Sequence, residues 1–158
     1  MTREIWHSVF IVAPVDVVMD ALVQEEHIQK WWTREASVRD GKGDFGWSAH
    51  GWKVGLDMEH DLAAREVAWR CTSSNMQNTN AWEGTMITFS LSPENAGTRV
   101  AFAQTGYRHS PCFDACDQGW SYFVGISLKQ YAEAGKGIPY PEMQDTGAKR
   151  DMQAAAGE

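Results

Sequence analysis

Gln104 and Tyr107 are the polar residues best placed to contact a small molecule. Val100 and Phe102 alternate with polar or small neighbours, as in a strand with one apolar face. Gln104 continues that face, and Tyr107 follows at the end of the strand. A buried polar group without a partner costs free energy. These two side chains therefore hydrogen-bond a ligand, serve an acid–base step, or are satisfied by backbone or water.

Tryptophan is the unusual component, with eight copies in 158 residues. An indole offers a large rigid face and one N–H donor, so it can stack on a flat apolar molecule. Trp47, Trp69 and Trp120 are candidates for a pocket wall, and core packing is the alternative for each of them.

Two other groups contain residue types that could do chemistry. His109, Cys112 and Cys116 could form a zinc-like set, but no second Cys pair or His cluster supports it. We predict no metal there, and a loop that leads into a capped helix. Glu59-His60-Asp61 and His50 lie at the ends of predicted strands, where solvated charge is common, so a general base there is the weaker alternative.

Composition excludes several classes of partner. The 21 acidic and 14 basic residues give a net charge of −7, and the basic residues are scattered. Nucleic acid and anionic membranes need clustered positive charge, so neither is expected as a partner. No apolar run could span a bilayer, and Met1 to Glu4 lack the basic start of a leader. With three cysteines expected as reduced thiols, we predict a cytoplasmic location.

The apolar periodicity gives the order of elements. A β-rich run predicts a strand over 5–12, and Pro14 begins a short helix over 15–23. Glu25 and Glu26 begin a second helix that carries Trp31 and Trp32. From 36 to 106 the period is two, which predicts about six antiparallel strands. Apolar residues at helical spacing then predict a long helix from about Asp114 to Gly135.

This order predicts an α+β fold in which a curved antiparallel sheet wraps around the long C-terminal helix. We expect one domain over 1–141 and a flexible tail over 142–158. One helix is too narrow to fill a broad curved sheet, so an apolar cavity is expected beneath it.

Several segments resemble the SRPBCC (START-like) superfamily, and within it the group related to the chaperone ATPase activator and to calicheamicin-resistance proteins. The matching segments, in chain order, are Ala13-Pro14, Val18, Trp31-Trp32, Trp82 to Thr85, Gly97 to Arg99, Gln104 to Tyr107, Gly119-Trp120, Ser127 to Tyr131 and Gly135 to Gly137. The resemblance implies a helix-grip fold (βααβ6α) with a hydrophobic cavity. It does not fix an activity, because the superfamily includes lipid carriers, cyclases, hydrolases and a resistance protein. Relatives often have His where this chain has Gln104, so no role of that imidazole is carried over.

The leading hypothesis is binding of a small, mostly apolar or aromatic molecule in the cavity, without a cofactor. The predicted wall consists of Val54, Trp69, Phe89, Phe102, Gln104, Trp120 and Phe123. A cyclase or hydrolase using the same cavity is the first alternative, although no triad or nucleophile motif supports it. A chaperone-regulating interaction module with a protein partner is the second. The chain is expected to be a monomer or a homodimer.

Overall fold

The computed structural model describes residues 2–108 and 113–142, and its first elements follow the sequence closely. Strand β1 (Thr2–Ile11) leads into helix α1 (Val15–Val23) and the short helix α2 (Glu25–Ile28). Pro14 is the N-cap of α1 in an extended conformation. Proline suits a helix start, because the missing N–H would have no partner there. The helix predicted over 15–23 is confirmed.

Six further strands complete one antiparallel sheet. They are β2 (Glu35–Arg39), β3 (Lys42–Trp47), β4 (Trp52–Asp61), β5 (Glu66–Ser74), β6 (Met86–Glu94) and β7 (Gly97–Arg108). The strand order is β1-β7-β6-β5-β4-β3-β2, so β1 and β2 form the two edges. Two short helical turns, η1 (Ser48–His50) and η2 (Met76–Asn78), lie in the connections.

The turn between β2 and β3 shows why this part of the sheet is a hairpin. Asp40 and Gly41 both have positive φ, of 52° and 76°. Two successive positive φ values match the twist of antiparallel strands, and glycine adopts them without strain. β2 and β3 therefore form a tight antiparallel hairpin.

The C-terminal helix has the predicted length but is less regular than its apolar spacing suggests. It consists of α3 (Phe113–Tyr122), a π-helical segment η3 (Phe123–Leu128) and α4 (Lys129–Ala134). Gly135 ends it in the left-handed conformation, as predicted. Asp114, near which the sequence predicts the helix start, lies inside the first turn, one residue after Phe113. A carboxylate in that turn still faces the positive end of the helix dipole.

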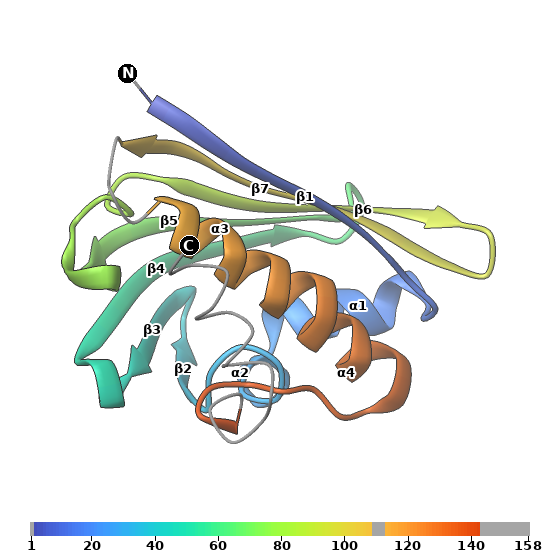
Figure 1. Cartoon of the computed structure of the whole chain (residues 1–158). Coiled ribbons are helices and arrows are strands. Elements are labelled where there is room, and N and C mark those ends of the chain that lie inside the picture. The colour runs from blue at the N-terminus through green and yellow to red at the C-terminus, as the bar shows by residue number, and fades with distance from the viewer. Residues whose placement is uncertain (1, 109–112, 143–158) are drawn as a thin grey trace.

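These elements form a helix-grip fold of the α+β class, and both predictions are confirmed. Figure 1 shows the C-terminal helix lying across the concave side of the curved sheet, with α1 and α2 beside it. No helix within 2–108 or 113–142 is long and apolar enough to cross a membrane. The predicted tail lies outside the described residues beyond Glu142, and the domain bounds stay a prediction.

Ser127 ties the helix to two other segments. Its hydroxyl donates to the Trp31 carbonyl at 2.6 Å and accepts from the Ile138 N–H at 2.8 Å. The side chain is completely buried. Gly137 runs so close that a Cβ there would lie 2.4 Å from the Lys30 carbonyl oxygen. The helix, the turn after α2 and the segment after α4 therefore share one buried polar joint.

Ser127→Ala should lower the free energy of unfolding by about 1–3 kcal/mol, because it leaves the Trp31 carbonyl and the Ile138 N–H without a partner. Ser121→Ala makes the same change at an exposed position of the same helix and should be nearly neutral. Urea unfolding of the three proteins measures the difference. Equal stabilities for the two variants would show that the buried joint contributes nothing.

Candidate ligand-binding site

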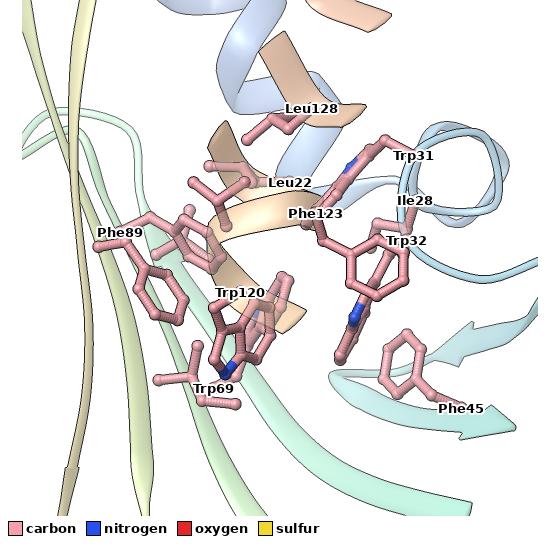
Figure 2. Close-up of a cluster of buried hydrophobic side chains, with 14 of the residues drawn as sticks. Leu22, Ile28, Trp31, Trp32, Phe45, Trp69, Phe89, Trp120, Phe123 and Leu128 are labelled. Carbon is pink, nitrogen blue, oxygen red and sulfur yellow. The ribbon is translucent and has the colours of Figure 1, made fainter. Parts of the chain in front are cut away.

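The interior between helix and sheet is occupied by aromatic rings that touch one another. Trp32, 1% exposed, lies at their centre. Its ring centroid is 4.7 to 6.1 Å from those of Trp31, Phe45, Trp47, Trp69 and Trp120. Figure 2 shows Trp32, Trp69 and Trp120 converging from the turn after α2, from β5 and from α3. We call these rings, with Trp82, Phe89 and Phe102, the aromatic cluster.

Four members of the cluster form a row of nearly parallel indoles, the indole stack. Trp32 lies between Trp69 and Trp120, at centroid distances of 5.4 and 5.3 Å and interplanar angles of 18° and 28°. Trp82 continues the row beyond Trp120, at 5.6 Å and 16°. Offset stacking is a favoured arrangement of aromatic rings. The stack gives the interior a row of flat apolar faces with a common orientation.

The turn after α2 holds Trp31 and Trp32 in the interior. The Trp31 indole N–H donates to the Ala21 carbonyl on α1 at 2.7 Å. The Trp31 carbonyl accepts the Ser127 hydroxyl, as described above. Both sides of the turn are thereby fixed, and the adjacent Trp32 ring projects into the cluster (Figure 2).

A buried amide adjoins one member of the stack. Gln104 accepts the Trp120 indole N–H at 2.8 Å and donates to the Thr85 hydroxyl at 3.0 Å. Thr85 donates in turn to the Trp82 carbonyl at 2.7 Å. A primary amide has two N–H donors and two lone pairs on its oxygen. Gln104 therefore has one donor and one acceptor beyond these two bonds, close to Trp120.

A buried thiol lies at the same end of the cluster. Cys116 on α3 accepts the Trp82 indole N–H at 3.3 Å and the Tyr107 hydroxyl at 3.2 Å. Tyr107 is thus directed at sulfur, and its ring packs edge-on against Phe113. Cys71 is a separate buried thiol on β5, and burial raises its pKa to about 12. A thiol with so high a pKa stays protonated and unreactive at neutral pH.

All seven side chains predicted for the ligand wall are buried. They are Val54, Trp69, Phe89, Phe102, Gln104, Trp120 and Phe123. Trp69, Phe89, Phe102 and Trp120 form a continuous row with centroid distances of 4.6 to 5.2 Å.

The remaining wall residues lie at different places. Gln104 joins this row through its bond to Trp120. Val54 lies opposite Phe45 on the neighbouring strand, and Phe123 packs edge-on against Tyr122 at 5.3 Å. Their contact with a ligand stays a prediction.

Sequence reasoning missed Trp32, Trp82 and Thr85 as parts of this site. Trp32 and Trp82 lie in turns, where no periodicity marks the inward face. Thr85 alternates with Ile87 and Phe89, so the period of two places it on their apolar face, and a buried hydroxyl near a buried amide was the available signal.

The histidine alternatives lie elsewhere. His50 belongs to η1 rather than to a strand, and it is exposed and stacked on Trp52 at 4.3 Å. The exposed end of β4 carries Glu59-His60-Asp61, as predicted. In the described residues, no three His, Cys, Asp or Glu side chains come together as metal ligands. Of the His109 to Cys116 motif, residues 109–112 lie outside the described part.

A curved antiparallel sheet around a long C-terminal helix, with this apolar interior, defines the helix-grip class. The model of the family "Activator of Hsp90 ATPase homolog 1-like protein" matches residues 12–133, and the chain belongs to this family. The resemblance to the Aha-type group of the SRPBCC superfamily is thus confirmed. No curated protein matches the sequence.

Solved structures agree with the family. The Aha1 dimer from Colwellia psychrerythraea is 26% identical with a TM-score of 0.72, covering 85% of this chain and 99% of that one. CalU16 from Micromonospora echinospora is 21% identical with a TM-score of 0.61, covering 99% and 88%. DynU16, from the dynemicin biosynthetic locus, is 20% identical with a TM-score of 0.67, covering 85% of this chain and 48% of that one. The last two show a shared fold.

The bonds of Gln104 can be tested by a double-mutant cycle. Gln104→Met keeps the length of the side chain but leaves the Trp120 N–H unpaired, so it should cost about 1–3 kcal/mol of unfolding free energy. Thr85→Val removes the other partner. Because the two residues share one bond, the double variant should lose less than the sum of the single losses.

Gln130→Met, at an exposed position of α4, is the control and should change stability little. Additive losses from Gln104→Met and Thr85→Val would contradict the Gln104–Thr85 coupling.

Proposed function

We propose that the protein binds a small, flat, mostly apolar molecule between the C-terminal helix and the sheet. The single observation that carries this proposal is the indole stack beside the buried amide of Gln104. Parallel indole faces recognise flat apolar rings through dispersion and quadrupole contacts. A polar group in such surroundings fixes the orientation of the ligand.

The remaining hydrogen-bond donor and acceptor of Gln104 restrict the chemical class of the ligand. One N–H and one lone pair remain on the amide after its bonds to Thr85 and Trp120. A cyclic amide has the matching acceptor and donor on one edge of a flat ring. The proposed ligand class is therefore a fused aromatic ring system with an amide-like edge.

Entry requires movement of the helix, because the rings of the cluster already touch one another. The helix is least regular at this point. Gly119 directly precedes Trp120, and Gly125 lies in the π-helical segment η3. Each glycine in a helix interior costs about 1 kcal/mol relative to alanine. Isolated π-helical turns are frequent at functional sites. The helix would therefore open at the segment 119–128, where its backbone is least regular, and opening there would break the two bonds of Ser127.

The expected affinity is modest. Burying roughly 300 Å² of ligand surface contributes about 7 kcal/mol before association costs. Opening the helix reduces the apparent affinity further, by the fraction of molecules that are open. Dissociation constants in the micromolar to millimolar range follow.

A second candidate is regulation of a chaperone ATPase. The family description supports it, and so does the mutual contact of the interior rings, which suits a function at the surface. This candidate predicts acceleration of a purified Hsp90-type ATPase without any small ligand. The ligand titration below separates the two candidates.

The test is a titration of tryptophan fluorescence with two bicyclic probes of similar shape, naphthalene and 2-quinolinone. The background variant Trp6→Phe removes an exposed indole that is not part of the aromatic cluster. Both probes should give saturable quenching. Gln104→Met should weaken 2-quinolinone about tenfold, through lost hydrogen bonding, and naphthalene less than about twofold.

Gln130→Met is the matched control and should leave both titrations unchanged. Linear, non-saturable quenching by both probes in the folded protein would refute the proposal. Equal losses for the two probes in Gln104→Met would refute the role of the amide.

A further inference from the structure

We propose that the exposed part of β1 is a self-association edge, on which a second copy of this chain adds its own β1 as an antiparallel strand. The inference is independent of ligand binding. The sheet has two edges, β1 and β2, and an edge strand presents unpaired N–H and C=O groups that can template another strand.

The β2 edge is covered by side chains of the helical segment beside it. Glu25 accepts the Val38 N–H at 2.8 Å. The Gln29 amide donates to the Ala36 carbonyl at 2.8 Å. Successive outward groups of this short strand are thereby satisfied within the chain. A partner strand would have to displace both bonds.

The β1 edge is covered only at its C-terminal end. Lys129 donates to the Phe10 carbonyl, and Glu133 accepts the Val12 N–H at 2.7 Å. Backbone groups of alternate residues in a strand point to the same side. The N–H and C=O groups of Trp6 and Ser8 therefore point outward as well. Within the described ranges, no side chain or backbone group covers them. Figure 1 shows β1 along the outside of the sheet, with the helix near its C-terminal end.

The uncovered stretch carries an exposed, oriented aromatic side chain. Trp6 is 64% exposed. Its indole N–H donates to Glu4 on the same strand at 2.8 Å, which holds the ring in one orientation. Exposed tryptophans of this kind are typical anchors of protein interfaces, and a pre-oriented ring loses little entropy on binding.

A second copy fits this edge because the stretch is self-complementary. In an antiparallel pair centred on Trp6, the two Trp6 rings meet on the twofold axis and Glu4 of each chain lies opposite Ser8 of the other. Ser8 already accepts a bond from Arg99 at 3.4 Å. The guanidinium of Arg99 pairs with Glu94 at 2.9 and 3.0 Å. The carboxylate of Glu4 would approach this ion pair once on each side of the axis.

The same geometry limits the size of the interface. Pairing must stop before Phe10, where Lys129 and Glu133 occupy the edge. A short strand pair with two aromatic anchors lies at the small end of stable interfaces. The dimer should therefore form reversibly and depend on concentration.

Sedimentation velocity over a concentration series, with reducing agent, tests the proposal. The mass should rise from that of one chain, 17.7 kDa, towards twice that value. Trp6→Lys should weaken the dimer at least about tenfold by placing like charges on the axis. Ser8→Pro removes an outward N–H without breaking a bond to β7, and should weaken it similarly.

Two control variants separate pairing at the β1 edge from other effects of a substitution. Leu62→Lys changes the more exposed Leu62, 68% exposed and outside the strands, and should dimerise like the unchanged protein. Ser8→Ala keeps the N–H and should retain most of the association. A monomer at every concentration would overturn the proposal. So would a dimer that persists in Trp6→Lys, or one that is lost in Trp6→Lys but not in folded Ser8→Pro.

Discussion

The packing of the Trp32 ring is the contact on which the rest of the structure depends. This ring touches aromatic rings from β3, β5 and α3, so a side chain from a short turn connects two strands of the sheet with the helix. The turn keeps its position through the bond from Trp31 to Ala21 and the bond from Ser127 to the Trp31 carbonyl. A large ring buried on all sides tolerates little displacement, because interiors are close-packed.

This constraint explains the irregularity of the C-terminal helix. The helix must deliver Trp120 to Trp32 and to Gln104 at one end, and Ser127 to the Trp31 carbonyl at the other. The π-helical segment η3 begins after Trp120 and contains Ser127. The buried bonds of Trp120 and Ser127 offset the free-energy cost of the π-helical turn. The middle of the helix is therefore held mainly by contacts with the rest of the chain. A helix held in this way can open locally while the sheet stays intact.

Much of the fold could be predicted from the sequence for two reasons. The strands have one apolar face, and helix ends are marked by local residues such as proline and glycine. Alternation identified the buried faces of Trp69, Phe89 and Phe102, while Pro14 and Gly135 marked helix ends. The prediction that the second helix carries Trp31 and Trp32 is wrong, because α2 ends at Ile28 and both residues lie in the turn after it. A residue in a turn has no periodic neighbours to show where its side chain points. The π-helical turn was missed for a related reason: it results from contacts distant in sequence. His50 was placed in a strand because a β-rich run precedes it, whereas the left-handed Gly51 closes a helical turn there.

The central claim is that the helix segment over the indole stack opens separately from the sheet. Native-state hydrogen exchange at low denaturant concentrations measures this directly. The account predicts that amides of α3 and η3 exchange through a local opening at least about 2 kcal/mol below the free energy of global unfolding, while amides of β6 and β7 exchange only through global unfolding. Exchange of helix and sheet amides at the same free energy, with the same denaturant dependence, would contradict it.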